Sequence, residues 1–550
     1  MIKEIIHAHL LESLENLGIS HEKEFSVEIP NIVEHGDYST NCALILAKEN
    51  KRAPKALAED LIKALKKNKD YKKVELAGPG FINFVMSTAF FQKMFWEIYK
   101  AGADFAASDF GKGEKILIEF ISANPTGPLN IVNARAAAFG DTLYRVMNKV
   151  GYAPSREFYI NDAGNQVDIL AESLELRLRE LHGEKIGDFP YEAYHGEYVK
   201  HLAQKLNATE GVRVFMMTEK DRMEHLKEFA LAEILEMQRH SLELFDVVFD
   251  GWVSEKTLRA EGVVEEVLSY LTEADCTFEK DDAVWFASTK FGDDKDRVLM
   301  KSDGSITYFV PDLAYHLTKI QRGFTTLIDI FGPDHHGYVP RIKAAFKALG
   351  YDEDMLEIIY LQQVNLYESG ERVKMSKRAG KIVTMDDLIS VVGKDASRYF
   401  FIARKANAHL NFDLELAMEQ SNENPVYYCQ YAHARICSII RKAKKDKIWP
   451  KHFKKEFISK LNKTEERALI QKLSDLPELL SLIAVHREPH RLTTYLEELS
   501  AMVHKYYARY QIVSTKSKDL SRARLMLLDM VKTAMVIVFD LMGISAPEKM

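Results

Sequence analysis

A short basic segment at residues 371–381, with the sequence ERVKMSKRAGK, carries side chains suited to polyphosphate chemistry. Lys374, Lys377 and Arg378 can neutralise the negative charge that a polyphosphate gains in a transition state. A run of basic residues is most often a solvated loop, but the specific order Lys-Met-Ser-Lys argues against that interpretation here. The segment is therefore a candidate phosphate-binding site.

A second candidate is the stretch 115–150, where a strand leads into a helix through a loop of small residues. Residues 115–120 are an apolar run typical of a buried strand, and the apolar spacing over 139–150 indicates one face of a helix. The loop at 122–128 leaves the first N–H groups of that helix free, beside the positive end of its dipole, which is a place to hold phosphate. Many α/β proteins contain such turns without binding anything, so this stretch alone decides little.

The elements that must position these two segments alternate between strand and helix over about 115–410. That alternation predicts a mostly parallel sheet with helices on both faces. A long, charged and helical stretch at about 165–295 interrupts it, and we interpret this stretch as an insertion between two halves of one nucleotide-binding fold. Strands resume at Thr325–Phe331 and Leu356–Leu361. Ligands of such folds bind beyond the carboxyl ends of the strands, where the strand order reverses, so both segments can meet there.

Two further parts flank this region. Residues 1–110 mix helical and strand patterns, whereas residues 416–550 contain four stretches of helical periodicity. A chain of 550 residues is long enough for about three domains. We therefore predict an α/β protein in which a Rossmann-like parallel-sheet catalytic domain at 111–415 lies between an N-terminal α+β domain and a C-terminal all-helical domain.

Composition excludes several classes of protein and site. The formal net charge of −7 argues against non-specific binding of nucleic acid by the whole surface, but it allows a local basic face. No apolar run reaches the ~18 residues that a membrane span needs, and the charged N-terminus reads as an amphipathic helix, not as a signal peptide. The four cysteines form no CxxC pair, so we predict no metal site, no disulfide framework and a reducing cytoplasm.

Eight stretches along the chain carry a resemblance to a known family. The two candidate segments look like the two signatures of class I aminoacyl-tRNA synthetases, and the detail is similar to arginyl-tRNA synthetase. The resemblance covers essentially the full length. The stretches are HGDYSTNCALILAK (35–48), AGPGFINF (77–84), SANPTGPL (122–129), FYINDAGNQ (158–166), KSDGSITYF (301–309), GPDHHGYVPRIKAA (332–345), NPVYYCQYAHAR (424–435) and GISAPEKM (543–550).

The resemblance implies an activity, its substrates and its partners. Members of the family use ATP, with Mg²⁺, to convert L-arginine to arginyl-adenylate, and then transfer the arginine to the 3′ end of tRNA(Arg). The family typically needs tRNA bound before it activates arginine, and its members are monomers by default. Its N-terminal domain contacts the elbow of the tRNA and its helical C-terminal domain reads the anticodon.

The resemblance also implies an arginine pocket. A planar guanidinium needs carboxylates and other acceptors around it. Tyr308 and Asp312 would hold it at the start of a helix, with Glu119 nearby at the carboxyl end of the first strand. Without the resemblance, Asp312 in a first helical turn is more simply explained by the helix dipole. The predicted arginine-binding residues are Glu119, Ser122, Asn124, Asn133, Tyr308 and Asp312.

ATP is expected between the helix start near residue 130 and the basic segment. Gly332 and Asp334 follow a predicted strand, where a glycine allows close approach of a ribose and an aspartate can accept from its hydroxyls. His335 and His336 are adjacent, but no third ligand at suitable spacing accompanies them, so a zinc site is not indicated. The predicted ATP-binding residues are Pro128, Asn130, Asn133, Gly332, Asp334, His335, His336, Met375, Ser376 and Lys377, and the predicted catalytic residues are Lys374, Lys377, Asn130 and Asn133.

The first signature departs from the family pattern. The family usually has two histidines at the positions of Asn130 and Asn133, with a glycine at the position of Val132. An asparagine amide can donate a hydrogen bond but cannot carry positive charge. We interpret the pair as an active variant, and we keep two alternatives: a catalytically silent tRNA-binding relative, and a synthetase for another amino acid.

Basic and aromatic side chains gather near the end of the third predicted C-terminal helix, over residues 504–510. Such side chains suit single-stranded RNA, whose bases stack and whose phosphates need neutralising. Some of them must instead face the core of a helical bundle. In the N-terminal domain, Tyr38 or Phe81 could stack on bases in the same way. The predicted tRNA-binding residues of the C-terminal domain are Tyr431, Arg435, Tyr507 and Arg509.

Overall fold

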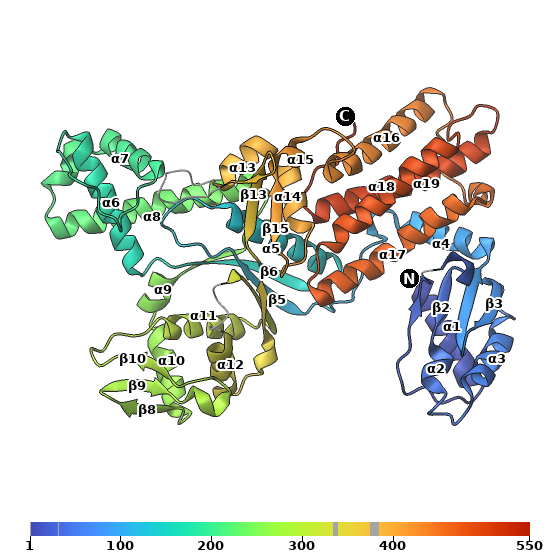
Figure 1. Ribbon diagram of the computed structural model, residues 1–550, viewed down its shortest axis with the longest axis horizontal. Coiled ribbons are helices and arrows are strands. Elements are labelled where there is room, and N and C mark those ends of the chain that lie inside the picture. The colour runs from blue at the N-terminus through green and yellow to red at the C-terminus, as the bar shows by residue number, and fades with distance from the viewer. Residues whose placement is uncertain (1, 31, 334–338, 374–383) are drawn as a thin grey trace.

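The computed structural model describes residues 2–30, 32–333, 339–373 and 384–550. Figure 1 shows a central sheet with a helical insertion and a small antiparallel module on one side, and a bundle of long helices on the other. The N-terminal part of the chain forms a separate unit beside that bundle. Over the described residues, no helix is both long and apolar enough to cross a membrane.

The central sheet has five parallel strands in the order β12-β11-β5-β6-β7. The chain runs outward from β5 through β6 to β7 and then returns to β11 and β12, so the strand order reverses between β5 and β11. The predicted parallel sheet is confirmed, and its switch point is the expected place for a ligand. The strands are β5 (Lys115–Phe120), β6 (Ala153–Ile160), β7 (Gly251–Ser254), β11 (Thr326–Phe331) and β12 (Leu356–Tyr360).

Helices cover this sheet. The helix α5 (Ile131–Lys149) connects β5 to β6, and the helix α11 (Phe309–Gln321) precedes β11. The helix α12 (Val339–Ala348) connects β11 to β12. Buried side chains of α5, such as Phe139, Leu143 and Val146, share one core with the strands because apolar residues recur every three or four positions.

The inserted stretch differs from the expectation of a helical insertion at about 165–295. Three helices, α6 (Asn165–Leu181), α7 (Glu197–Thr209) and α8 (Glu219–Leu244), pack around a core of their own. However, β7 returns to the central sheet, and a three-stranded antiparallel sheet follows. The four residues of β7 are all half-buried, so the strand has neither a fully buried face nor an alternation of buried and exposed side chains. Its sequence therefore shows neither of the patterns that predict a strand. The elements after β7 are α9 (Glu255–Ala260), α10 (Val263–Glu273), β8 (Thr277–Lys280), β9 (Ala283–Phe286) and β10 (Arg297–Met300).

A smaller mixed sheet, in the order β14-β13-β15, follows the central sheet. Its strands β13 and β15 are parallel, and β14 pairs with β13 in an antiparallel hairpin. β14 forms the first two residues of the basic segment, 371–381, that is predicted to bind phosphate. The elements are β13 (Val364–Glu368), β14 (Glu371–Arg372), α13 (Met385–Val392), α14 (Lys394–Ile402), β15 (Leu410–Asp413) and α15 (Leu414–Met418).

The N-terminal unit is a four-stranded antiparallel sheet with helices, as the α+β prediction requires. Tyr38 is fully buried, so it cannot stack on RNA, whereas Phe81 is 40% exposed. Phe81 and Asn83 line a pocket of about 560 Å³ on this unit. The elements are α1 (Ile2–Asn16), β1 (Val27–Glu28), β2 (Tyr38–Thr40), α2 (Cys42–Leu46), α3 (Pro54–Leu65), β3 (Tyr71–Ala77), β4 (Phe81–Met86) and α4 (Thr88–Ala101).

The C-terminal part is a helical bundle, as predicted (Figure 1). A buried carboxylate joins it to the part of the chain that holds the central sheet: Asp141 on α5 accepts hydrogen bonds from Arg145, Arg156 and Arg398. Arg145 and Arg398 also donate to the main-chain carbonyls of Asp540 and Met542, at the end of the bundle. The four long helices are α16 (Pro425–Lys445), α17 (Thr464–His486), α18 (Arg491–Arg509) and α19 (Lys518–Leu541).

Gly543 makes this junction possible. Its φ is +65°, and a Cβ added to it would lie 2.4 Å from Cζ of the buried Arg398. We expect Gly543→Ala to destabilise the protein by about 2–4 kcal/mol, because left-handed strain and overpacking add together. Gly350→Ala is the matched control: φ is +79°, but its Cβ would meet no atom within 4 Å. Equal unfolding midpoints in urea for the two variants would contradict this account of the junction.

Candidate active site

The two asparagines of the first signature form the start of α5. The Asn130 side-chain oxygen accepts hydrogen bonds from the main-chain N–H groups of Val132 (2.8 Å) and Asn133 (3.1 Å). The Asn133 side-chain oxygen accepts from the main-chain N–H of Asn130 at 3.0 Å. These reciprocal bonds are a capping box, which satisfies N–H groups that a helix start otherwise leaves free.

The capping box decides which way both amides face. Only the Oδ1 atoms can accept from main-chain N–H groups, so each Nδ2 points away from the helix start. Within the described residues, neither Nδ2 has a hydrogen-bond partner, and both side chains are partly exposed. The sequence positions where the family has histidines therefore present two neutral donors on one side of α5.

The turn between β5 and α5 is strained. Ile121 and Ser122 have φ of 71° and 38°, in the left-handed region that β-branched residues rarely adopt. Ser122 Oγ donates to Oε1 of Glu119 at 2.8 Å and accepts from the main-chain N–H of Tyr159 at 3.1 Å. The turn thus places Ser122 at the carboxyl edge of the sheet, beside the switch point.

The inserted helices hold the rest of this loop. The Tyr198 hydroxyl on α7 donates to the carbonyl of Thr126 at 2.7 Å. Gln238 on α8 is fully buried and donates to the carbonyls of Asn124 (3.2 Å) and Gly127 (2.9 Å). No pattern in the sequence pointed to Tyr198 or Gln238, because both sit at ordinary positions of amphipathic helices.

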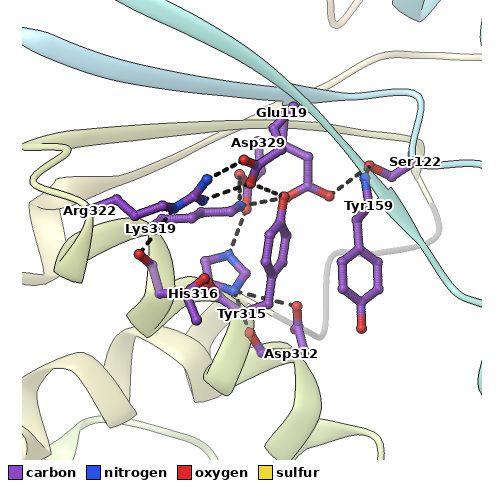
Figure 2. Close-up of polar contacts among 11 residues, drawn as sticks. Glu119, Ser122, Tyr159, Asp312, Tyr315, His316, Lys319, Arg322 and Asp329 are labelled. Atoms are coloured by element: carbon purple, nitrogen blue, oxygen red, sulfur yellow. Dashed lines mark hydrogen bonds and ion pairs between the residues drawn. The ribbon is translucent and has the colours of Figure 1, made fainter. Parts of the chain in front are cut away.

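A chain of buried charges lies at the switch point, and Figure 2 shows it. Glu119 and Asp329 are opposite each other on β5 and β11. Lys319 on α11 is fully buried, and its Nζ lies 2.5 Å from Oε2 of Glu119 and 3.1 Å from Oδ1 of Asp329. Burial disfavours the ammonium, but the two carboxylates outweigh it and raise the pKa of Lys319 above its ordinary value.

His316 continues this chain toward the surface. Its Nε2 donates to Oδ2 of Asp329 and its Nδ1 donates to the carbonyl of Asp312, each at 2.8 Å. Because both ring nitrogens donate, the ring is an imidazolium. Burial and the nearby Lys319 lower the pKa of His316, but the opposite effect of Asp312 and Asp329 is larger. The pKa is therefore raised above the ordinary value of a histidine, to about 10.

Asp312 ends the chain with one free oxygen. Its Oδ1 lies 3.4 Å from His316 Nδ1, whereas its Oδ2 is buried and has no hydrogen-bond partner among the described residues. Tyr308 precedes α11 and its side chain is 72% exposed. The structure thus brings Asp312 and Glu119 to one end of the sheet. It also shows what the sequence did not: Lys319 already neutralises Glu119, so Asp312 is the carboxylate left for a cationic ligand.

The flank of the second signature meets the first. Thr384 pairs with Asn130 in an isolated β-bridge, and the main-chain N–H of Met385 donates to the carbonyl of Leu129 at 2.8 Å. Pro128 lies in the same loop, half-buried. An added Cβ at Gly332, just after β11, would meet no atom within 4 Å. The predicted site residues outside the described ranges are Asp334, His335, His336, Lys374, Met375, Ser376 and Lys377.

Comparisons with known proteins decide the family. The model of the arginyl tRNA synthetase N terminal domain matches residues 3–86, that of the class I (R) tRNA synthetase catalytic domain matches residues 102–438, and that of the DALR anticodon binding domain matches residues 429–550. The chain belongs to the class I arginyl-tRNA synthetases. The predicted arginine–tRNA ligase is confirmed, and the silent alternative finds no support.

Relatives of this synthetase match it over its whole length. The arginine–tRNA ligases of Bacillus licheniformis and Bacillus subtilis are each 44% identical to it over 100% of this chain, and over 99% and 98% of their own lengths. A putative arginyl-tRNA synthetase from Campylobacter jejuni has a TM-score of 0.77 at 35% identity and covers 84% of this chain and 100% of its own. The arginyl-tRNA synthetase of Thermus thermophilus has a TM-score of 0.77 at 21% identity over 100% of both chains, a likeness that shows the fold.

Three of the four residues predicted to bind tRNA in the synthetase's C-terminal domain gather on α16 and α18. Arg435 donates to the Tyr431 hydroxyl at 2.9 Å, and its guanidinium lies 4.8 Å from the centre of the Tyr431 ring and 4.9 Å from that of Tyr507. Arg509 is not part of this cluster, because it forms an ion pair with Glu465 of α17. Tyr507 and Arg509 are two positions apart on α18, so their side chains point in different directions.

Asn124, another predicted arginine-binding residue, also has a side-chain partner in the protein. Asn124 is exposed, and its Nδ2 donates to the side-chain oxygen of Gln166 at the start of α6, at 2.8 Å. Its main-chain carbonyl is the one that Gln238 holds. The position of Asn124 in the synthetase is therefore set from the inserted helices.

Proposed function

We propose that this synthetase forms arginyl-adenylate at the switch point between β5 and β11. The observation that carries the proposal is the free, buried Oδ2 of Asp312 near the sheet edge at which α5 begins. A guanidinium placed against that oxygen puts the α-carboxylate of arginine toward the start of α5. The carboxylate then attacks the α-phosphate of ATP, and pyrophosphate leaves.

The arginine pocket assigns one role to each side chain. Asp312 and Tyr308 hold the guanidinium, and Glu119 supports them from behind while Lys319 balances its charge. Ser122, Asn124 and Asn133 take the end of the substrate that carries the amino and carboxylate groups. Arginine is selected by charge and by a planar hydrogen-bonding head, which a polar pocket can discriminate without a separate editing domain.

ATP lies across α5 and the basic segment in this proposal. Asn130 and Asn133 donate from their amides to phosphate oxygens, and Lys374 and Lys377 stabilise charge on the α-phosphate and on the leaving pyrophosphate. The further ATP contacts are Pro128, Gly332, Asp334, His335, His336, Met375 and Ser376. No group of three or more His, Cys, Asp or Glu side chains placed to hold a metal occurs in the described part of the chain. Magnesium accompanies the phosphates of ATP in this proposal.

tRNA(Arg) binds along the helical side of the molecule in this proposal. Tyr431 and Tyr507 stack on anticodon bases, and Arg435 between their rings contacts a phosphate. Arg509 contributes only if its ion pair with Glu465 opens. The exposed Phe81 and its pocket on the N-terminal unit take a base of the tRNA elbow. We propose the domain bounds 1–110, 111–415 and 416–550, a monomer, and a cytoplasmic location.

Arginylation of tRNA(Arg) in competition with other amino acids tests the assignment of the pocket. We expect arginine to be used and citrulline, its uncharged analogue, to be rejected by about 10⁴-fold or more in kcat/KM, because the buried Oδ2 of Asp312 would lose its cationic partner. Lysine lacks the planar fork and should also be rejected. Comparable use of lysine would overturn the pocket, and intact tRNA binding without any arginylation would revive the silent alternative.

A further inference from the structure

Arg135 lies on α5, two residues after Asn133, and its side chain is buried to 1% exposure. Its guanidinium donates only to main-chain carbonyls: Nη1 to Gln362 at 2.5 Å, and Nη2 to Lys405 at 3.0 Å, Ala408 at 3.1 Å and Ala406 at 3.5 Å. Within the described residues no carboxylate forms an ion pair with it. The proposed mechanism gives this cation no role.

A buried guanidinium without a counter-charge is costly. Burial lowers the pKa of Arg135 to about 10, which leaves it charged near neutral pH. An aliphatic side chain would fill the same space without that cost, but it would leave the carbonyls without a donor. The rigid fork of a guanidinium reaches several acceptors at once, which an ammonium cannot do. The arrangement therefore fixes the positions of the chain segments that carry these four carbonyls.

The carbonyls belong to the base of the small sheet. Gln362 lies in the turn between β12 and β13, and residues 405–408 lie in the loop between α14 and β15. These two loops also bond to each other, because the N–H of Gln362 donates to the carbonyl of Ala406 at 3.0 Å. β13 leads through β14 directly to the basic segment. Arg135 thus attaches the strands that precede the basic segment to the first turns of α5.

The other flank of the basic segment is attached to the same helix. Thr384 and Met385, which follow the segment, bond to Asn130 and Leu129 through the main chain. Both flanks are therefore attached to the start of α5. One is attached through the hydrogen bonds of Arg135, and the other through the β-bridge between Asn130 and Thr384. The distance between the Asn130 and Asn133 amides and the chain on either side of the basic segment depends on both attachments.

We propose that Arg135 is a positioning residue for adenylate formation, which sets the place of the β13–β15 strand pair on α5 and so of the described chain that leads into the second signature. This inference rests on the proposed roles of Asn130 and Lys377. It predicts a selective defect, because Arg135 donates no hydrogen bond, among the described residues, to the residues that would hold the guanidinium, Asp312, Tyr308 and Glu119. Loss of Arg135 should lower kcat/KM for ATP and leave KM for arginine unchanged.

Arg135→Lys and Arg135→Gln test the proposal in ATP–pyrophosphate exchange with tRNA present. An ammonium reaches some of the four carbonyls, so we expect kcat/KM for ATP to fall about 10-fold in Arg135→Lys and about 10²-fold in Arg135→Gln, the size of effect that a misplacement of about 1 Å produces. KM for arginine and Kd for tRNA should stay within twofold. Arg398→Lys is the matched control, because Arg398 is as deeply buried and also donates to main-chain carbonyls, but attaches α14 to α8 and α19.

A double variant separates positioning from general damage. If Arg135 acts through the basic segment, Arg135→Lys should cost little more in a Lys377→Ala background, whereas independent effects would multiply. Equal losses in ATP, arginine and tRNA parameters, matching those of Arg398→Lys, would reduce Arg135 to a structural role. An Arg135→Lys enzyme with wild-type kinetics would overturn the inference. Lys377→Ala with wild-type exchange would instead overturn the proposed function on which it rests.

Discussion

Asp312→Asn should lower kcat/KM for arginine by about 10²–10⁴-fold and raise KM for arginine, while the enzyme stays folded. The substitution keeps the shape of the side chain and removes its charge. Removing one partner of a buried ion pair costs about 3–5 kcal/mol, and each 1.36 kcal/mol is about tenfold. The effect should be specific to arginine, because the ion-pair partner of Asp312 among the described residues is His316, which we do not assign to ATP. Steady-state ATP–pyrophosphate exchange, with arginine varied at saturating ATP and tRNA, measures it.

Glu265→Gln is the matched control for Asp312→Asn. Glu265 also lies in the first turn of a helix, α10, but its side chain is exposed and has no ion pair among those found in the described residues. Both substitutions remove the same favourable interaction with a helix dipole, of about 0.3–1 kcal/mol. If Asp312→Asn and Glu265→Gln had the same small effect, the role of Asp312 would be the dipole alone. An unchanged KM for arginine in Asp312→Asn would remove the pocket assignment.

Asn130→Ala and Asn133→Ala should each lower the rate of adenylate formation by about 10²–10³-fold, the usual cost of removing one preorganised transition-state donor. Each substitution also breaks the capping box, which costs about 1 kcal/mol of stability. The two effects have to be separated, because a frayed start of α5 would also misplace the catalytic groups. Single-turnover adenylate formation with saturating ATP, arginine and tRNA gives the rate directly.

Two further variants make that separation. Asn130→Asp keeps the side-chain oxygen that caps α5 but loses the amide donor, so it should be as slow as Asn130→Ala while its stability is kept. Ser87→Ala removes the N-cap of α4, where Ser87 Oγ accepts from the N–H of Phe90, at a site remote from the chemistry. It should lose similar stability without loss of rate. A fast Asn130→Asp enzyme would show that the asparagines matter only as caps.

Much of the fold could be predicted because local patterns and global structure agree. The apolar run at 115–120 became β5, and the helical spacing over 139–150 became the buried face of α5. The C-terminal helices appeared where periodicity placed them. β7 was missed because its four residues show no periodic pattern. The loop after β5 was predicted, but the left-handed conformation of Ile121 was not, because strain at a single residue leaves no composition signal.

The candidate site was only partly predictable, since charge balance depends on residues far apart in sequence. Glu119 could be placed at the sheet edge from its position in a strand, but its neutralisation by Lys319 needs the pairing of β5 with β11 and the packing of α11. Arg135 is similar: nothing in the run NARAAAFGD distinguishes a surface arginine from one that holds four carbonyls. Such residues become visible only when the loops that they hold are in place.

The most direct test of the central claim, that two asparagines replace the histidines of the first signature in a working enzyme, is ATP–pyrophosphate exchange by the wild-type protein with arginine, with and without tRNA(Arg). We expect arginine-dependent exchange that requires tRNA, and that falls in both Asn130→Ala and Asn133→Ala. Absence of exchange in both conditions, with tRNA still bound, would contradict the claim. So would exchange that neither substitution slows.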